Sequence, residues 1–331
     1  MIRALYCNEN GVCRIDLKPE EFAQALEDKQ GLLWVDFQGE PPEVCEPILR
    51  QTFGFHPLAV DDALQESHVP KVDDWGQYLY IVLHAVLYDE DEEHKEHVDT
   101  LETDLFLGPN FVVTHHDQSV TALERVWGSC QRDERHLRHG ADYLAYRMAD
   151  ELVAEYMPAV EAIEEAIDRI EDQIFDTATP ETVEHIFALK RALLRLRRIV
   201  MPQREVLNKL ARGDFPVLDA ESRAFFRDVY DHLVRLNDIN ESMRDLLSGV
   251  MDTYLSVINN RMNETMKTLT IIATLFMPLS FVVGFFGMNF FQPVATSMKA
   301  WTTELALGVT LAIIALAPTG MLFWAWRRGW I

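Results

Sequence analysis

Residues 267–290 read KTLTIIATLFMPLSFVVGFFGMNF, and this stretch decides the fold of the chain. From Thr268 to Met288 it contains no Asp, Glu, Lys, Arg or His, and a helix of about this length crosses ~30 Å of hydrocarbon. A second uncharged run follows at residues 305–326. Both runs lie at the C-terminal end of an otherwise polar chain of 331 residues. The sequence therefore predicts a membrane protein with two C-terminal spans and most of its mass on one side of the bilayer.

The charges that flank the two spans predict their orientation. Arg261 and Lys267 precede the first span (268–288), and a basic tail at 327–331 follows the second. The connecting loop, residues 291–304, carries a single lysine and a single glutamate. By the positive-inside rule both termini face the cytoplasm and the loop faces outward. We therefore expect a multi-pass protein of the cell (inner) membrane.

The charge balance limits the partners of the protein. Its formal net charge of -23 argues against nucleic acid as a partner. The negative charge is concentrated outside the spans, because the spans hold almost none of it. An acidic surface raises the local concentration of cations, although solubility alone also accounts for such a surface.

The cysteines and the N-terminus indicate how the chain reaches the membrane. The four cysteines, Cys7, Cys13, Cys45 and Cys130, form no CxxC pair and no regular framework. We therefore expect reduced thiols in a cytosolic domain. The N-terminal residues lack the long apolar core of a signal peptide, so the C-terminal spans are expected to drive insertion.

Residues 1–135 predict a layered α/β domain. Runs rich in aromatic and β-branched residues, bounded by Gly, Pro or Asn, predict strands. They lie at 4–7, 32–37, 78–88, 103–108 and 111–116. Helices with proline in the first turn are expected at 19–27, 41–52 and 57–65. A mixture of strands and helices of this kind is typical of α/β layers.

Residues 136–220 predict a helical hairpin. An acidic helix at 140–176 is followed by a turn at Thr179-Pro180 and a basic helix at 181–212. The opposite charges of the two helices predict antiparallel packing with ion pairs across the hairpin.

Residues 221–290 predict one long stalk helix that continues into the first span. This stretch contains no proline before Pro278. A helix from Glu221 to Met288 would be roughly 100 Å long, and such a helix needs neighbours to be stable. We therefore expect the chain to oligomerise.

One face of this helix has the pattern of a helical-bundle seam. Its positions alternate in steps of three and four residues and hold small or adaptable side chains. They are Asn263, Met266, Thr270, Ala273, Met277, Ser280 and Gly284. Leu269 lies beside this face and is an alternative to Thr270. Such a face either lines a pore or lets helices pack closely in lipid, and the absence of ionisable residues from both spans favours the pore.

The first span ends at Gly287-Met288-Asn289 on the predicted outer side. A ring of Asn289 carbonyl oxygens could hold a cation through its hydration water, which suits Mg²⁺ because this ion dehydrates reluctantly. Asn289 could instead be only the C-cap of the helix, since Asn tolerates the left-handed conformation.

The chain resembles the CorA family of divalent-cation channels. The resemblance rests on Gly287-Met288-Asn289 between two C-terminal spans, on NETMKTLTIIATLFMPLSF (263–281), on FFRDVYDH (225–232) and on HPLAVDDAL (56–64). It implies a funnel-shaped homopentamer with an α/β/α cytoplasmic domain and a pore lined by the first span of each subunit. It also implies that Asn289 binds hydrated Mg²⁺ at the outer mouth, with Gly287 and Met288 shaping the turn.

The resemblance also implies roles for residues in the pore and in its regulation. The pore wall would comprise Asn263, Met266, Leu269, Met277, Ser280 and Gly284, with Leu269 rather than Thr270 in the hydrophobic constriction. Mg²⁺ bound between cytoplasmic domains would hold the channel closed. The matching carboxylates are Asp89 in YDEDEE and Asp228 in FRDVYDH, and Asp252 on the stalk is a further candidate.

The expected function is Mg²⁺ influx through a channel that cytoplasmic Mg²⁺ closes, with Co²⁺ and Ni²⁺ as further ions and with lipid and its own copies as partners. An enzyme is not expected, because no nucleophile–base pair or phosphate loop is present. One departure from the family is the outer loop, which lacks the tripeptide Met-Pro-Glu. Two alternatives stay open: zinc transport, given His94 and His97, and a membrane-anchored sensor without transport.

Overall fold

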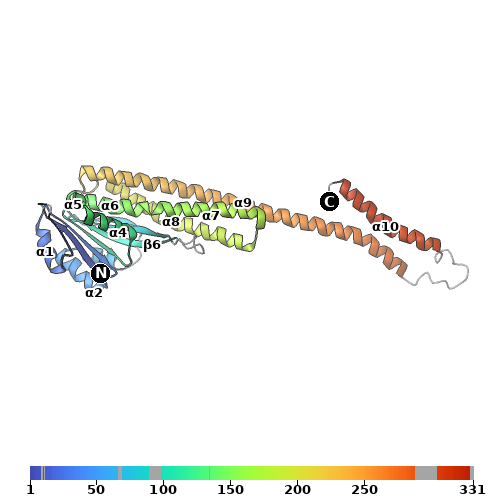
Figure 1. Cartoon of the computed structure of the whole chain (residues 1–331), viewed down its shortest axis with the longest axis horizontal. Helices are drawn as coiled ribbons and strands as arrows, with labels where there is room; N and C mark the ends of the chain where they lie inside the picture. Colours follow the sequence, from blue (N-terminus) through green and yellow to red (C-terminus); the bar gives the residue numbers. More distant parts are fainter. Residues whose placement is uncertain are drawn as a thin grey trace. The chain divides into compact units, whose positions relative to one another are not determined.

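The computed structural model describes residues 1–8, 10, 12–65, 69–88, 98–133, 135–287 and 304–328. The chain divides into two compact units, Met1–Asp252 and Thr253–Ile331. The first unit contains a sheet covered by helices, and the second contains two long apolar helical segments (Figure 1). Helix α9 (Ala220–Gly287) contributes residues to both units, so each part of it is described with its own unit.

The strands of the first unit form one mixed sheet in the order β2-β1-β3-β7-β6-β5-β4. They are β1 (Ile2–Cys7), β2 (Cys13–Ile15), β3 (Leu32–Gln38), β4 (Lys71–Asp74), β5 (Leu79–Tyr88), β6 (Val98–Leu107) and β7 (Phe111–His116). β3 and β7 run parallel, and the other neighbouring strands are antiparallel. The longer strands confirm the prediction, except that β6 begins at Val98 and was predicted only from residue 103. The short edge strands β2 and β4 were not predicted, because three or four residues carry no alternation of their own.

The helices of the first unit precede and follow this sheet in the chain. They are α1 (Pro19–Glu27), α2 (Pro42–Pro47), η1 (Ile48–Thr52), α3 (Pro57–Leu64), α4 (Thr121–Arg132), α5 (Arg135–Arg138), α6 (Ala141–Ala154), α7 (Tyr156–Thr177), α8 (Pro180–Arg212) and the first part of α9. Proline occupies the first turn of α1, α2, α3 and α8. Its fixed φ suits a helix start, and its missing N–H would have no partner there.

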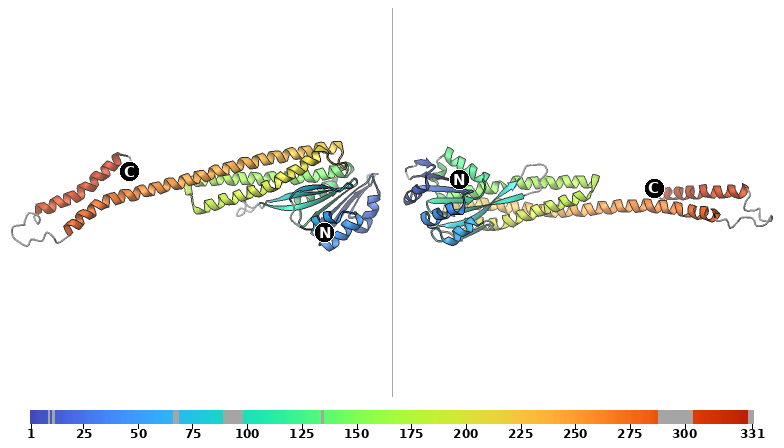
Figure 2. Two further views of the ribbon diagram at one scale, coloured as in Figure 1. Left: turned by 180° about the vertical axis from the view of Figure 1, so that it is seen from behind. Right: turned by 90° about the horizontal axis from the view of Figure 1, so that it is seen from below.

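The sheet separates two layers of helices, which Figure 2 shows from two sides. On one face, Phe22, Leu49 and Val60 from α1, η1 and α3 pack with Val35 and Phe106 of the sheet. Helices α4, α6, α7 and α8 lie on the opposite face. Successive side chains of a strand point to opposite faces, so both faces of β3 are buried, one with Leu33, Val35 and Phe37 and the other with Trp34 and the charged Asp36. The predicted α/β/α layering is confirmed.

The acidic helix predicted at 140–176 is two helices, α6 and α7, which meet at Glu155. Pro158 in the first turn of α7 accounts for the break, because proline has no N–H to donate to the carbonyl of Ala154. The single-helix prediction is therefore wrong at this point.

Apolar contacts hold α7 against α8. Ile167 and Ile174 of α7 and Leu189 and Leu193 of α8 are buried. Among the described residues, α7 and α8 make ion pairs of other kinds. Glu165 pairs with Arg169 within α7, and Arg195 of α8 pairs with Asp99 of β6. The predicted charge pairing across the hairpin is not among them. Exposed pairs contribute less than ~1 kcal/mol, too little to position long side chains.

Cys7 and Cys13 face each other across the β1–β2 hairpin and form a disulfide. The prediction of four reduced thiols is therefore wrong for this pair, since a six-residue separation in sequence did not reveal that a tight hairpin makes the two residues partners. Cys45 and Cys130 are free and buried.

The second unit contains the C-terminal part of α9 and α10 (Glu304–Arg327), which lie side by side in both figures. Each helix is long and apolar enough to span a membrane. A core helix of a soluble protein would meet the same criterion, but it would be mostly buried. Here only 0% and 6% of the residues in the two apolar windows are buried. The exposed apolar surface therefore supports the two predicted spans.

A buried charged network joins β1, β3 and β7 in the first unit. The carboxylate of Asp36 accepts hydrogen bonds from Arg3 Nε (2.8 Å) and from the Thr114 hydroxyl. His116 Nε2 lies 3.0 Å from Asp36 Oδ1, and His116 Nδ1 contacts the carbonyl oxygen of Gln118. Both partners of the imidazole are acceptors, so both ring nitrogens must donate. The network therefore contains a protonated His116 beside an ionised Asp36.

The pKa values of this pair move apart in the folded protein. Burial alone would lower the pKa of His116, but the hydrogen bond and the charge of Asp36 outweigh burial and raise it. Burial alone would raise the pKa of Asp36, but the hydrogen bond and charge of His116 outweigh burial and lower it. Each group therefore stabilises the charged form of the other.

This network predicts how stability depends on pH. The raised pKa of His116 gives a contribution that is complete below its unfolded value of ~6.5 and is lost as pH rises through the folded value. The lowered pKa of Asp36 gives a contribution that is complete above ~3.9 and is lost as pH falls through the folded value. We expect the thermal midpoint of the full-length protein in detergent to fall as pH is raised from 6 to 9. His116→Gln should lower the midpoint at pH 6 and flatten the slope.

Tryptophan fluorescence can follow this transition, because Trp34 donates to Thr114 and Trp127 lies 4.3 Å from the Arg3 guanidinium. Asp133→Asn, which removes an exposed ion pair with Arg135, is the matched control and should keep the wild-type slope. If His116→Gln left the pH dependence of the thermal midpoint unchanged, the charged pair of His116 and Asp36 would be contradicted.

Candidate pore face and cytoplasmic carboxylates

Within the second unit, α9 packs one side against α10. Ile271, Leu275, Pro278, Leu279 and Val282 are the half-buried positions of this segment. Four of them, with Ile271 as the exception, line a small cavity together with Ile313, Ala317 and Met321 of α10. Ile271 lines a second groove beside α10. This packed side fixes which side of α9 remains uncovered.

The predicted pore face lies opposite that packed side. At 3.6 residues per turn, the two sets of positions fall on opposite sides of the helix. Asn263, Ser280 and Gly284 are exposed. Met266 and Met277 are 58% and 73% exposed. The face is therefore free of α10 and available either to line an ion pathway or to contact another copy.

The structure distinguishes Leu269 from Thr270. Thr270 lines the groove that α9 forms with Trp324 of α10, and its hydroxyl donates to the Met266 carbonyl oxygen at 2.7 Å. Leu269 is 60% exposed and lies further round the helix from α10. This placement favours Leu269 as the residue that would face a pathway.

Three of the predicted site residues, Asp89, Met288 and Asn289, lie outside the described residues, as do the alternative zinc ligands His94 and His97. Gly287 is the last residue of α9 and is exposed.

In the first unit, α9 has a packed side and an exposed acidic side. Its buried residues recur in steps of three and four, as in Phe226, Val229 and Leu233. The opposite side carries Asp228 and a further set of exposed aspartates at seven-residue intervals, which we call the acidic stripe. The stripe consists of Asp231, Asp238, Asp245 and Asp252. Sequence analysis selected only Asp252 from this set, although the seven-residue spacing is readable in the sequence.

Asp228 lies near a carboxylate that sequence analysis missed. Asp150 of α6 is partly buried, and burial raises its pKa. The charges of Arg147, 4.0 Å away, and of His232 oppose this shift, whereas those of Glu151 and, least of all, Asp228 add to it. The carboxylates of Asp150 and Asp228 therefore act on each other between α6 and α9, with cationic groups nearby. Because they are far apart in sequence, only the fold reveals the pair.

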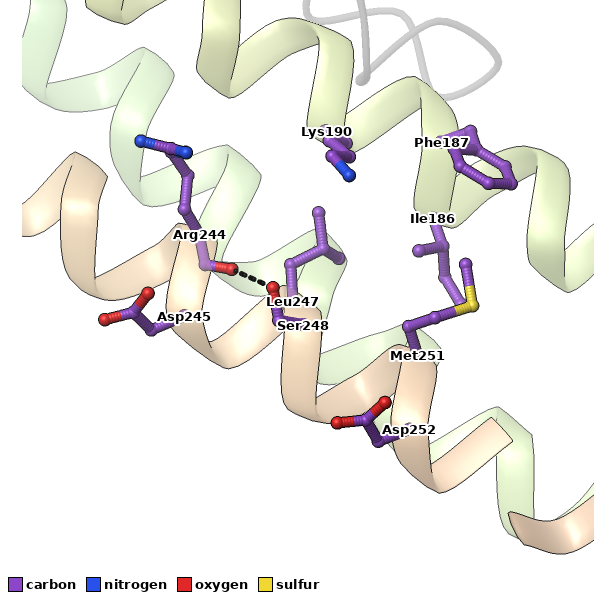
Figure 3. Close-up of a pocket in the computed structure, with 9 residues that line it drawn as sticks. All are labelled: Ile186, Phe187, Lys190, Arg244, Asp245, Leu247, Ser248, Met251 and Asp252. Atoms are coloured by element: carbon purple, nitrogen blue, oxygen red, sulfur yellow. Dashed lines mark hydrogen bonds between the residues drawn. The ribbon is translucent and has the colours of Figure 1, made fainter. Parts of the chain in front are cut away.

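Asp252 has different surroundings from Asp228. It lines a pocket of about 310 Å³ between α8 and α9, together with Asp245, Lys190 and Arg244 (Figure 3). Leu247 and Met251 point toward α8 in this view. Two cationic side chains in the same pocket weaken its attraction for a metal ion. Cationic side chains therefore lie near both candidates, Lys190 and Arg244 beside Asp252 and Arg147 beside Asp150.

The described residues of one chain do not complete a metal site. Among them there is no group of three or more His, Cys, Asp or Glu side chains that could hold a metal ion. Neighbouring members of the acidic stripe are about 10 Å apart along the helix, too far to share one ion. A cation at these carboxylates would need further ligands from water or from another copy.

Comparison with known proteins places this geometry in a family. Residues 29–326 match the family model described as CorA-like Mg2+ transporter protein. The chain is 37% identical to YfjQ of Bacillus subtilis (strain 168) over 90% of this chain and 89% of that protein. It is 33% identical to the cobalt/magnesium transport protein CorA of Thermotoga maritima over 90% of this chain and 83% of that protein. The complete structure of the CorA magnesium transporter from Methanocaldococcus jannaschii has the same fold, with a TM-score of 0.80, 24% identity and coverage of 99% and 98% of the two chains.

The exposed face of α9 predicts a pattern of cysteine accessibility. In membranes, Ser280→Cys should react roughly tenfold or more faster with a charged, water-soluble thiol reagent than Leu279→Cys, whose side chain packs toward α10. Burial raises the pKa of Cys45 to about 11 and that of Cys130 to about 12, so the native thiols give little background. Equal, slow reaction at both positions would mean that the face meets lipid or protein instead of lining an aqueous path.

Proposed function

Because the chain belongs to the CorA-like Mg²⁺ transporter family, it is a divalent-cation transporter, and we propose that it works as a Mg²⁺ channel that cytoplasmic Mg²⁺ closes. The observation that carries the proposal is the uncharged, uncovered face of α9 within a chain that matches the family over residues 29–326. We further propose that the channel is a homopentamer of the cell (inner) membrane, with both termini in the cytoplasm.

The pathway follows from the two sides of α9. One helix cannot enclose a pore, but several copies around an axis can place their uncovered faces inward. Leu269 and Met277 would then form apolar rings, which block ions when they lose water. Asn263, before these rings in the chain, and Ser280 and Gly284, after them, would form the more polar or smaller rings. No side chain on this face is ionisable, so the ion would cross as a hydrated species.

The proposed filter is the ring of Asn289 side chains at the outer end, with Gly287 and Met288 in the turn. Amide oxygens are neutral, so they can accept hydrogen bonds from the water of a hydrated cation without holding the ion tightly. This suits Mg²⁺, which keeps several of its waters. Conduction requires binding weak enough for the ion to leave.

The proposed sensor is the pair Asp228 and Asp150, with Asp89 as a ligand from a neighbouring copy. Carboxylates that face each other repel, and a divalent cation converts this repulsion into a bridge. Each ion stabilises the closed state by ~1.4 kcal/mol at ten times its Kd. Moving a two-state gate from 1:99 to 99:1 takes ~5.5 kcal/mol. About four such ions around a ring are therefore sufficient, a number that a pentamer can hold.

Substitution of the proposed filter residue tests the function directly. Asn289→Ala should abolish Mg²⁺ uptake into liposomes containing the purified protein while leaving the oligomer assembled, because only the ligand ring is lost. The matched control is Asn260→Ala, since Asn260 is exposed on another side of α9 and should keep wild-type flux. Normal flux through Asn289→Ala would disprove its role in the filter. Parallel flux measurements with Zn²⁺, Co²⁺ and Ni²⁺ establish the ion preference.

Neutralising Asp228 tests the sensor. Asp228→Asn should raise the internal Mg²⁺ concentration that half-inhibits uptake roughly 5-fold or more, the lower end of common coupling energies. Asp150→Asn should act in the same direction, and the double variant should add little if both residues hold the same ion. Asp172→Asn, on the exposed side of α7, is the control. Wild-type inhibition in both single variants would place the sensor elsewhere.

A further inference from the structure

The second unit contains a groove between α9 and α10 at the end of the spans that carries basic residues. Its volume is about 260 Å³, and it is lined by Thr270, Thr274, Leu275, Met321, Trp324 and Ala325 among others. Leu275 and Met321 also line the next cavity along the two helices, beside Pro278 and Pro318, and that cavity measures only about 20 Å³. The space between the helices is therefore open at the basic end and closes toward the middle of the spans.

The lining of the groove is mostly apolar. The hydroxyls of Thr270 and Thr274 donate to the carbonyl oxygens of Met266 and Thr270, each at 2.7 Å, so their protons are already used within α9. Among the described residues, none that lines the groove is charged. Its volume is below the range usual for pockets that take drug-sized ligands, which suits a slender apolar chain.

Basic side chains stand at the open end. Lys267 precedes Thr270 by one turn of α9, and Arg327 and Arg328 follow Trp324 by about one turn of α10. Helices α9 and α10 lie side by side and run in opposite directions (Figures 1 and 2). By their positions in the sequence, all three residues therefore lie at the same end of the groove. The Arg328 guanidinium lies 5.3 Å from the ring centroid of Trp324, which is 50% exposed. Trp and basic residues together are typical of the headgroup level of a membrane.

We infer that this groove binds one acyl chain of an anionic phospholipid, whose phosphate lies among Lys267, Arg327 and Arg328. A second copy of the chain is a poorer occupant of the open end, because copies arranged around an axis place their own Lys267, Arg327 and Arg328 at the same height and so add positive charges there. An anionic headgroup neutralises them, and basic side chains at a membrane surface attract such lipids. The ligand is therefore a lipid of the inner leaflet with negative charge.

Native mass spectrometry of the full-length protein in detergent tests this inference. With phosphatidylglycerol we expect a retained lipid for each subunit, and with phosphatidylcholine of the same chain length clearly weaker retention. Arg327→Gln combined with Arg328→Gln should reduce the preference for phosphatidylglycerol about tenfold or more, since it removes two charges at the headgroup level.

Filling the groove separates a specific site from general lipid adhesion. Thr274→Trp places a large side chain in the groove and should abolish retention, whereas Phe276→Trp, on an exposed part of α9 away from α10, should leave it unchanged. Ala325→Leu fills the groove from α10 and serves if Thr274→Trp does not fold. Phosphatidylglycerol brominated on its acyl chain should quench Trp324, so that Trp324→Phe loses this part of the quenching.

The results of these experiments distinguish an anionic lipid from a second copy of the chain as the occupant of the groove. Equal retention of the two lipids by the wild type, or retention that survives both filling substitutions, would overturn the inference. Loss of the oligomer in Thr274→Trp and Ala325→Leu, without lipid retained by the wild type, would mean that a second copy covers the groove. Because these measurements do not use transport, they succeed or fail independently of the proposed channel function.

Discussion

The structure depends on α9 burying only one side in each unit. In the first unit that side packs on the neighbouring helices, and Asn240 of α9 donates to the Leu193 carbonyl oxygen of α8 at 3.2 Å. In the second unit it packs on α10. The exposed side of α9 differs in charge between the two units: it is acidic in the first unit and uncharged in the second. Water can cover an acidic side, but an uncharged side in a membrane must be met by lipid, by protein or by a pore.

In the first unit, the buried carboxylate of Asp36 is paired, whereas exposed carboxylates such as that of Asp228 face solvent. At Asp36 every charge has a partner, because the carboxylate accepts from Arg3, Thr114 and His116. A buried charge without such partners would cost several kcal/mol. The surplus of acid that gives the chain its net charge of -23 is instead placed where water or cations can reach it, as at Asp228. Stability and cation attraction therefore use separate sets of carboxylates.

Local signals in the sequence predicted much of the fold, because they act over a few residues. Proline in the first turn marked α1 and α3, runs rich in aromatic and β-branched residues marked the longer strands, and the uncharged run marked the first span. Features that depend on contacts over a long sequence separation were missed. The Asp150–Asp228 pair joins α6 to α9, and the partners of Asp36 come from β1 and β7. The Cys7–Cys13 pair depended on a hairpin whose second strand has only three residues.

The choice between Leu269 and Thr270 shows what the structure adds at the pore face. A seven-residue repeat allows either residue, since both lie within half a turn of the same line along the helix. Both residues are exposed, but Thr270 lines the groove beside α10 and Leu269 does not, and this difference favours Leu269. The same argument extends to the cytoplasmic carboxylates. Mg²⁺ demands near-octahedral oxygen coordination, and Asp228 with Asp150 supplies only part of it. In the proposed channel a neighbouring copy would complete the shell of a cation bound there, and sensing the ion and holding the assembly together would then be the same event.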